Sequence, residues 1–425
     1  MAENMAKPPT SASILVVGGG ISGITTALEA AEVGYDIILI EKEPSLGGRV
    51  AQLKYYFPKL CPPTCGLEIN YRRIKNNKKI KVYTLAEVEK VTGNPGDYEV
   101  TIRLNPRYVN ENCTCCGECE KASRAEIPNE FNFEMDKTKG AYLPHQMAFP
   151  ARYVISQQII GTDDAKRCQD ACQYNAIDLT METKTITIKV GAIVWATGWV
   201  PYDATRIDNL GFGRYDNIIT NMMMERLAAI NGPTQGQIQK PSDGKAPESV
   251  AFVQCAGSRD ENHLPYCSYI CCMASLKQAT YIREQLPDAK IYIFYIDLRA
   301  PGYKYEKFYA KLKEDKNVFM IKGKVAEVQE TDDNRITVIA ENAVTGEKIK
   351  QTVDMAVLAT GMQPQTSLAK LPADLTYSED GFIINDFEKG GMFAAGCANK
   401  PADVITSNQN ATGMALKAIQ TLVRR

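Results

Sequence analysis

Short runs of apolar, β-branched residues alternate along the chain with stretches whose apolar positions suit a helix. Residues 13–17, SILVV, predict a buried parallel strand, and residues 36–40, DIILI, predict a second one. The stretch ITTALEAAEVG between them is compatible with a helix. This order predicts a βαβ unit at the start of an α/β fold.

Glycines fill the turn between the first predicted strand and its helix. Gly18, Gly20 and Gly23 have the spacing G-x-G-x-x-G, and Glu41 follows the second strand about twenty residues later. Gly18 would permit the tight turn, Gly20 the approach of a pyrophosphate, Gly23 close helix packing and Glu41 a bond to a ribose hydroxyl. Three glycines alone would also suit a packing turn, but strand, helix and acid in register favour dinucleotide binding. The predicted site includes the helix start, Ile21 and Ser22.

Length and charge narrow the class of protein. The 425 residues suggest two or three domains. Lys and Arg number 49 against 50 Asp and Glu, which argues against nucleic-acid binding. The N-terminal stretch is polar and no run approaches 18 apolar residues, so we expect a cytoplasmic protein with no membrane span of its own.

Cysteine is the outlier of the composition. Thirteen cysteines without a secretory signal indicate metal or redox use, because disulfides are rare in reducing compartments. His145 and His263 are the only histidines, and we interpret neither as catalytic. Cys61 and Cys65 lie in FPKLCPPTCGLEI, where a structural role, flavin packing and redox chemistry all stay open.

Two cysteine runs in the region 106–180 resemble the ferredoxin ligand runs C-x2-C-x2-C-x3-C, in which the fourth cysteine serves the other cluster. The first run has Ser123 in its fourth place, and the second has Thr162 and Ala165 in its first two. One 4Fe-4S site would then be complete and one broken. The complete set is Cys113, Cys116, Cys119 and Cys172, while Cys168 is left over and Cys115 is a spare neighbour. Zinc or free thiols are the alternatives.

A second cysteine group follows the strand predicted at residues 249–254, SVAFVQ. The loop after it, CAGSRDEN, lacks the glycine spacing that cradles phosphate, so NAD or NADP is not expected there. We predict a 4Fe-4S cluster on four cysteines, two of them at the start of a helix, whose N-terminus favours thiolates. They are Cys255, Cys267, Cys271 and Cys272. A dithiol of the adjacent pair is the alternative, although it would be strained and would leave the other two unexplained.

Later motifs extend the comparison along most of the chain. PSLGGRV after Glu41, IVWATG at 193–198, VLATG at 357–361 and MFAAGC at 392–397 occur in an order that resembles the two-dinucleotide-binding-domain flavoproteins. The resemblance implies FAD at the first site. It adds as cofactor-binding candidates Lys42, Gly48, Arg49, Ala196, Thr197, Gly198, Gly361, Gly396 and Cys397.

Two of these candidates carry an alternative. That family usually has Asp where Cys397 stands, so Cys397 is either a small buried filler or a redox group. Lys42 is either a flavin-tuning charge, as we expect for Arg49, or a surface charge.

The expected fold class is therefore α/β, with a Rossmann-like FAD domain, a second Rossmann-like half and a degenerate ferredoxin-like insertion. We expect the FAD domain to begin at 11–105 and the insertion to occupy 106–180. The chain would return to the FAD domain with a linker at 181–240, form the second half at 249–350 and complete the FAD domain at 351–425.

The cysteine pattern after residue 255 resembles the A subunits of heterodisulfide reductases, whose cluster is held by a Cys, a loop and Cys-x3-Cys-Cys near the flavin. The chain ends without the further ferredoxin runs expected there. This compact form resembles the A subunits of the quinone-interacting membrane-bound oxidoreductase complexes of sulfate reducers. That resemblance implies three partners: another subunit with flavin and iron-sulfur clusters, one in the membrane with haem and iron-sulfur clusters, and adenylylsulfate reductase. The chain would sit at the inner face of the cytoplasmic membrane through these partners.

The function that this resemblance implies is the relay of electrons between a membrane quinone pool, reached through partner subunits, and adenylylsulfate reductase. Three other functions stay open. The flavin could bifurcate electrons, as the heterodisulfide reductase resemblance permits. The chain could be a stand-alone pyridine-nucleotide disulfide oxidoreductase that uses Cys61 and Cys65. A scaffold with zinc at its cysteines is the third.

Overall fold

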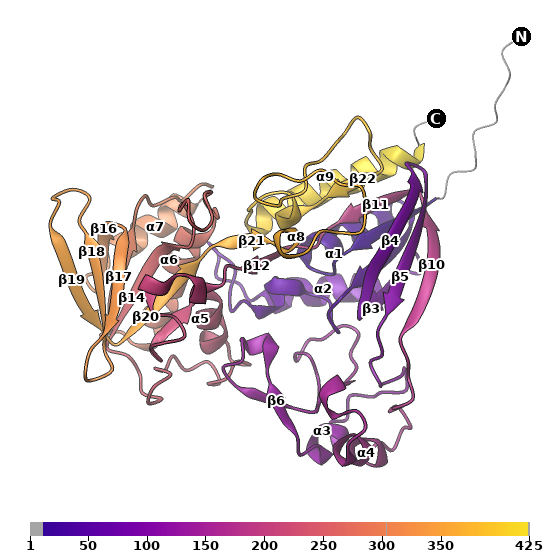
Figure 1. The fold of residues 1–425 in the computed structure, drawn as a ribbon, viewed down its shortest axis with the longest axis horizontal. Helices are drawn as coiled ribbons and strands as arrows, with labels where there is room; N and C mark the ends of the chain where they lie inside the picture. The colour runs from indigo at the N-terminus through magenta and orange to yellow at the C-terminus, as the bar shows by residue number, and fades with distance from the viewer. Residues whose placement is uncertain (1–11, 303, 424–425) are drawn as a thin grey trace, which may run out of the picture.

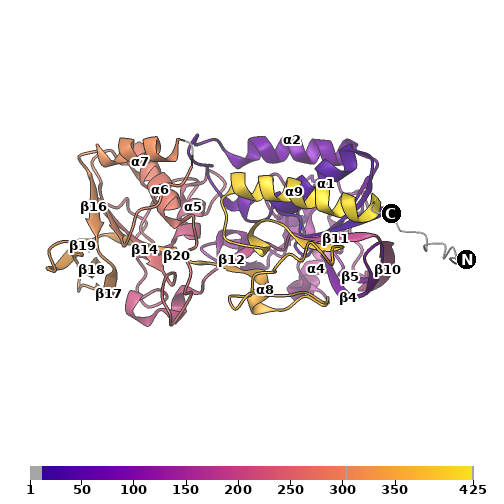
Figure 2. The ribbon, with the colours of Figure 1, turned by 90° about the horizontal axis from the view of Figure 1, so that it is seen from above.

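The computed structural model describes residues 12–302 and 304–423. Two α/β halves lie side by side along the long axis. A third, smaller part with α3, α4 and β6 lies below the half that contains α1 and α2 (Figure 1). From above, α1, α2 and α9 belong to one half and α5, α6 and α7 to the other (Figure 2). Among the described residues no helix is both long and apolar enough to cross a membrane.

The first half is a five-stranded parallel sheet in the order β22-β11-β1-β2-β3. Alternate residues of β1 face opposite sides: Ile14 packs under the helices, whereas Leu15 packs on a three-stranded antiparallel sheet. The parallel strands are β1 (Ser13–Val17), β2 (Asp36–Glu41), β3 (Ile80–Thr84), β11 (Ala192–Trp195) and β22 (Met392–Ala394). The helices are α1 (Ile21–Glu32), α2 (Pro63–Asn76) and α9 (Val404–Val423), and the second sheet is β4 (Ala86–Asn94), β5 (Asp97–Leu104) and β10 (Lys184–Val190).

The second half repeats this layout. Its parallel sheet has the order β13-β20-β14-β15-β16, with helices on one face and an antiparallel sheet, β17-β18-β19, on the other. The parallel strands are β13 (Ile218–Thr220), β14 (Ser249–Ala256), β15 (Lys290–Tyr295), β16 (Val318–Lys322) and β20 (Met355–Thr360). The other elements are α5 (Asn221–Ala228), α6 (Cys271–Gln285), α7 (Tyr305–Lys313), β17 (Val325–Glu330), β18 (Ile336–Glu341) and β19 (Lys348–Val353).

The chain crosses between the halves twice, through β12 (Trp199–Pro201) and β21 (Met362–Pro364), which pair antiparallel. A short helix, α8 (Gln365–Leu368), follows the second crossing. Both A-T-G segments lie directly before a crossing strand. The predicted fold class, with two dinucleotide-binding-type halves, is confirmed.

The insertion contains little regular structure around its cysteines. Its elements are α3 (Glu118–Ala122), α4 (Asp163–Asp170), β6 (Glu126–Pro128), β7 (Lys137–Lys139), β8 (Ala141–Tyr142) and β9 (Val154–Ile155). A separate core that contains Cys119 and Cys168 holds α3 and α4 together.

Two predicted boundaries of the second half differ from the structure. Strand β13 and helix α5, expected in the return at 181–240, belong to the second half, and so does β20, expected in the segment 351–425. The reason is pairing at a distance: β20 lies between β13 and β14, with Ala356 beside both Ile218 and Ala251. Local pattern alone gives no sign of which sheet a short apolar strand joins.

Candidate functional site

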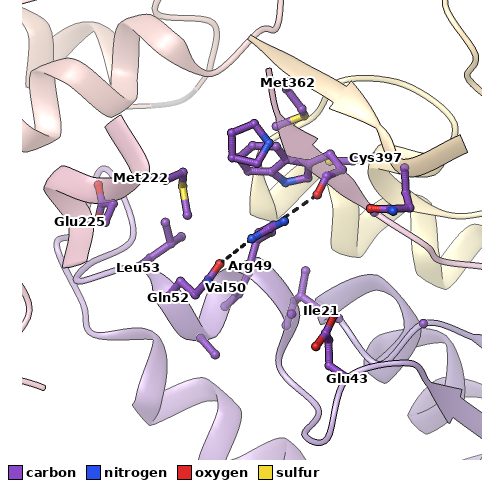
Figure 3. A pocket seen from close by; sticks show the side chains of 18 of the residues that line it. Ile21, Glu43, Arg49, Val50, Gln52, Leu53, Met222, Glu225, Met362 and Cys397 are labelled. Carbon is purple, nitrogen blue, oxygen red and sulfur yellow. Dashed lines mark hydrogen bonds between the residues drawn. The ribbon is translucent and has the colours of Figure 1, made fainter. Parts of the chain in front are cut away.

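A large cavity, of about 1810 Å³, opens where the two halves and the insertion meet. Twelve of the predicted cofactor-binding residues line it: Gly18, Gly20, Ile21, Ser22, Glu41, Lys42, Gly48, Arg49, Ala196, Thr197, Gly198 and Cys397. Figure 3 shows Ile21, Arg49 and Val50 on one side of it, Met362 and Cys397 on another, and Met222 and Glu225 of α5 across from them. The space therefore joins residues from nearly the whole length of the chain.

The glycine turn leaves the start of α1 open to this cavity. Gly18 has φ +109°, and a Cβ there would lie 2.3 Å from the carbonyl oxygen of Ala196. The N-cap residue, Gly20, supplies no side-chain cap, and the Cα of Gly48 lies close to it. Backbone amides at an uncapped helix start favour an anion such as a pyrophosphate. The residues present here fit the phosphates of a dinucleotide.

Three predicted glycines do not line the cavity. A Cβ on Gly23 would lie 1.8 Å from the carbonyl oxygen of Gly18, so this glycine lets α1 pack against the turn. Gly396 holds the loop before α9 against α1, because its Cβ would lie 2.1 Å from Ser22 Oγ. Gly361 lies in the second half, where its Cβ would meet Ser258 Oγ at 2.6 Å. The structure gives all three a packing role.

Glu41 is buried at the end of β2 and faces the cavity. One carboxylate oxygen accepts the amide of Gly19 at 2.6 Å, and the other accepts the amide of Glu43 at 2.8 Å. Burial raises the pKa of Glu41 to about 7, against the lowering effect of the two amides. The carboxylate is thus fixed in place beside the glycine turn.

Two cations were predicted near the flavin, and the structure separates them. Arg49 Nε donates to the carbonyl of Trp199 at 3.3 Å, and Nη1 donates to Gln52 Oε1 at 3.1 Å (Figure 3). Burial lowers the pKa of Arg49, but a guanidinium stays protonated in proteins. The side chain of Lys42 is 51% exposed and pairs with Glu43 at 3.7 Å. Arg49 is therefore the fixed positive charge in the cavity wall.

Two polar side chains after β11 and β22 differ in what they can do. Thr197 Oγ1 is buried and has no hydrogen-bond partner among the described residues, which leaves it available to a bound group. Cys397 Sγ donates to the carbonyl of Ala402 at 3.5 Å, and burial raises its pKa to about 11. A thiol with this pKa is not a thiolate at neutral pH, which argues against direct redox chemistry at Cys397.

A buried ion pair in the cavity wall was not predicted from the sequence. Lys277 Nζ of α6 lies 3.0 Å from Glu225 Oε1 of α5, and their side chains are only 3% and 1% exposed. Lys277 also donates to the carbonyl of Tyr55 at 2.8 Å, and Glu225 accepts bonds from Gln278 and from the hydroxyl of Tyr281. The sequence signal for this pair was a charged residue among the apolar positions of each helix, Glu225 in α5 and Lys277 in α6. The second half thereby places a buried ion pair in the wall of the cavity.

The second cysteine group lies at the carboxyl end of the second parallel sheet, where β14 and β20 are neighbours. Cys255 is the penultimate residue of β14, and Cys271 and Cys272 begin α6. Cys271 Sγ donates to the carbonyl of Thr360, the last residue of β20, at 3.9 Å. The chain leaves β14 toward β15 on one side and β20 lies on the other, so this is the topological switch point, where α/β sheets bind ligands.

The four cysteines of this group influence one another. The pKa of Cys255 is raised to about 11, first by burial and then by Cys272 and Cys267, and that of Cys271 is raised by burial and by the other three. The amide of Tyr269 donates to Cys267 Sγ at 3.4 Å. Tyr269 and Ile270, which stand between Cys267 and Cys271, line the large cavity. The predicted cluster site and the predicted flavin site thus share a wall.

The loop between β14 and α6 does not form a phosphate cradle. Ser258 and Ser268 are hydrogen-bonded at 2.6 Å, and Ser268 Oγ accepts the amide of Met362 at 2.8 Å. These bonds close the loop over the start of β21.

Four predicted ligands of the insertion come together. Cys113, Cys116, Cys119 and Cys172 all line one small cavity, of about 20 Å³, and neither Cys115 nor Cys168 does. The amide of Ala176 donates to Cys172 Sγ at 3.3 Å, and Cys116 is exposed. Four thiols without a carboxylate or imidazole suit a soft centre such as an iron-sulfur cluster or zinc. Across residues 12–302 and 304–423, no three His, Cys, Asp or Glu side chains stand close enough to hold a single metal ion.

The position of the broken ferredoxin site is filled by protein. Ser123 Oγ, in the fourth place of the first run, donates to Asp164 Oδ2 at 2.6 Å. Asp164 also accepts the amides of Arg124 and Ala125, and Cys168 and Ala165 are fully buried beside this network. A satisfied carboxylate stands where the second ligand set would be.

Cys61 and Cys65 are both exposed, but they face different places. Cys61 lines the large cavity, whereas Cys65, in the first turn of α2, lies in a separate surface hollow. None of the thirteen cysteines, all of which are among the described residues, forms a disulfide.

The fold is shared with solved flavoproteins. The thioredoxin reductase of Lactococcus lactis is 13% identical with a TM-score of 0.54, and that of T. acidophilum is 14% identical with a TM-score of 0.52. Both comparisons cover 97% of this chain, and they cover 99% and 98% of the two reductases. Residues 16–71 match the family model of an NAD(P)-binding Rossmann-like domain.

Curated relatives are A subunits of heterodisulfide reductases. The chain is 36% identical to the one from the H2:CoB–CoM heterodisulfide, ferredoxin reductase of Methanothermobacter thermautotrophicus, over 96% of its own length. It is 38% identical to one of the iron-sulfur A subunits of CoB–CoM heterodisulfide reductase in Methanopyrus kandleri, again over 96%. The chain spans 64% of the length of each of these relatives. The similarity to heterodisulfide reductase subunits therefore extends over nearly all of this chain.

Proposed function

We propose that this chain is an electron-transfer subunit of a larger oxidoreductase complex, with FAD in the large cavity and 4Fe-4S clusters on its two cysteine groups. The observation that carries the proposal is the shared wall. Tyr269 and Ile270 line the cavity and lie between two of the cysteines of the second half. Electrons could then pass between the two sites without crossing solvent.

The residues of the cavity would divide the work of holding FAD. The open start of α1, with Gly20 and Gly48, would take the pyrophosphate, and Glu41 a ribose hydroxyl. Thr197 Oγ1 offers an unused hydrogen-bonding group. Arg49 places a positive charge in the wall, which would stabilise added negative charge on a bound group.

FAD, when bound, exchanges electrons in pairs or singly, whereas an iron-sulfur cluster exchanges one at a time. The protein's part is to keep the two sites close and to set their potentials through fixed charges and hydrogen bonds. Lys277, paired with Glu225 of α5, would do this from α6, the helix that also carries Cys271 and Cys272. One rigid element would therefore position both a cluster ligand and a charge beside the flavin.

The finer assignment concerns partners. The resemblance to the quinone-interacting oxidoreductase family suggests that partner subunits link this chain to a membrane quinone pool and to adenylylsulfate reductase. The names of the curated relatives favour heterodisulfide reductase partners as the alternative. Affinity purification of the tagged chain from its native cells, followed by mass spectrometry of what co-purifies, separates the two sets.

The first experiment is an anaerobic purification with flavin, iron, acid-labile sulfide and zinc measured per chain. We expect about one FAD and about eight irons with matching sulfide, and a loss of about four irons in Cys271→Ser. Cys65→Ser is the matched control, because Cys65 is exposed on α2 and belongs to neither cysteine group, and it should keep the full content.

Other metal contents would contradict the proposal. Zinc in place of iron, or an iron content that Cys271→Ser leaves unchanged, would remove the cluster from the second half. Rapid reduction of the bound flavin by NADH or NADPH would favour the disulfide oxidoreductase alternative, with Cys61 as its cavity thiol.

A further inference from the structure

Arg259 lies next to two of the four cysteines of the second half. Its Nη2 donates to Asp297 Oδ2 at 3.0 Å, and the positive charge of its guanidinium acts on the thiols of Cys255 and Cys267. The carbonyl oxygen of the same aspartate accepts from Cys272 Sγ at 3.6 Å. Asp297 therefore contacts both Arg259 and the cysteine at the start of α6, which places the guanidinium next to the cysteine group.

The position of Arg259 is imposed by its backbone. Arg259 has φ +56°, in the left-handed region that residues other than glycine rarely adopt. Its backbone amide donates to the carbonyl of Tyr266 at 3.0 Å. Tyr269 in the same loop has φ +70°, and Cys255 near the end of β14 has φ +58°. Each costs on the order of 1–3 kcal/mol and persists only where the surroundings enforce it. The side chain of Arg259 is only 24% exposed, which also sets it apart from a free surface arginine.

A fixed cation at this place has a definite effect on a cluster. Four thiolates around a 4Fe-4S core carry net negative charge, and reduction adds one more electron. The potentials of such clusters depend on net charge and on hydrogen bonds to their sulfurs. Arginine suits this role because its guanidinium stays charged and donates several hydrogen bonds in a fixed plane.

We propose that Arg259, held in place by Asp297, raises the reduction potential of the cluster that Cys255, Cys267, Cys271 and Cys272 bind. Arg259 acts through the charge of its guanidinium, and Asp297 is a positioning residue. This inference rests on the proposed function, because it requires a cluster at these cysteines. It adds the group that decides how readily that cluster accepts an electron.

The test is a redox titration of the reduced-cluster EPR signal that disappears in Cys271→Ser. In Arg259→Gln, the ratio of reduced to oxidised cluster at a fixed potential should fall about tenfold, equivalent to about 59 mV for a one-electron couple. Arg259→Lys keeps the charge but not the planar fork, so its potential should lie between those of Arg259→Gln and the natural protein.

Asp297→Asn separates positioning from direct charge. Removal of a negative charge by itself would raise the potential of a nearby cluster. If Asp297 acts by holding Arg259, its loss frees the guanidinium and the potential should fall. Arg335→Gln is the matched control. Arg335 directly precedes β18, away from the cysteines, and pairs with Asp354, and its replacement changes the net charge by the same amount as Arg259→Gln. Its potential should not move.

Each outcome decides a separate point. An unchanged potential in Arg259→Gln with full iron content overturns the role of Arg259, and a raised potential in Asp297→Asn overturns the role of Asp297. If Arg259→Gln does not retain its iron, Arg259→Lys and Asp297→Asn decide the question on the same signal. An iron content that is insensitive to Cys271→Ser overturns the proposed function instead, before any titration.

Discussion

The two Rossmann-like halves have the same layout, but the loop between the first strand and the first helix differs in each and suits a different ligand. In the first half only Gly18, Gly19 and Gly20 separate β1 from α1, and the helix start opens into the large cavity. In the second half residues 257–270 separate β14 from α6, and this loop is closed by Ser258 and Ser268. The topology fixes where a site can form, and the loop residues decide which chemistry it has.

The acidic position shows the same contrast. Glu41 ends β2 and bonds the amides of the glycine turn and of Glu43. Asp297 follows β15, the corresponding strand of the second half, and holds Arg259 beside Cys255. An acid at the end of the second strand is thus kept in both halves, with a ribose as its proposed partner in one and an arginine as its partner in the other.

The largest effect on stability should come from breaking the buried ion pair of Lys277 and Glu225, which the second half contributes to the cavity wall. Lys277→Met leaves the carboxylate of Glu225 buried without its cation, and breaking such a pair costs about 3–5 kcal/mol. Urea unfolding should show this loss, and Lys277→Met combined with Glu225→Leu should recover part of it. A loss below about 1 kcal/mol would mean that Glu225 is neutral or reaches water.

The glycine turns should respond next, and unequally. In Gly23→Ala the added Cβ would lie 1.8 Å from the backbone carbonyl oxygen of Gly18, which cannot move aside as a side chain can. We expect the free energy of unfolding to fall by about 3 kcal/mol and the bound flavin to be lost. Gly66→Ala is the control, because nothing lies within 4 Å of its added Cβ.

The corresponding loop of the second half should tolerate the change better. Gly257 has φ +75°, so alanine there should cost about 1–2 kcal/mol of backbone strain. The added Cβ would also meet the ring of Tyr202 at 2.6 Å, but that side chain can shift, so iron and flavin should be retained. Equal losses in Gly23→Ala and Gly257→Ala, measured by thermal unfolding and flavin content, would remove the distinction between the two turns.

A separate effect is the pH dependence of Glu41. Its pKa is raised from 4.5 to about 7, so between these values the folded chain binds more protons than the unfolded chain. The contribution of Glu41 to stability should therefore fall as pH rises from about 4.5 to about 7, and stay constant above. Unfolding of the flavin-free chain should show this slope, and Glu41→Gln should lack it. A slope that persists in Glu41→Gln would assign it to another group.

The sequence by itself determined the elements that are encoded over short distances. The glycine turn, the strand before it and the acid after it are local, so the first βαβ unit followed from the pattern of residues 13–41. The spacing of the ferredoxin run likewise singled out Cys113, Cys116, Cys119 and Cys172, and the structure brings these four to one small cavity. Spacing works here because a few bonds along the chain limit where each side chain can reach.

Only the tertiary structure decided which distant segments meet. The assignment of β13 and β20 to the second sheet, the buried pair of Glu225 and Lys277 and the bond from Ser123 to Asp164 all join residues far apart in sequence. The hold of Asp297 on Arg259 belongs with them. Such contacts depend on how whole layers pack, because a buried charge is stable only where packing brings its partner within hydrogen-bond distance.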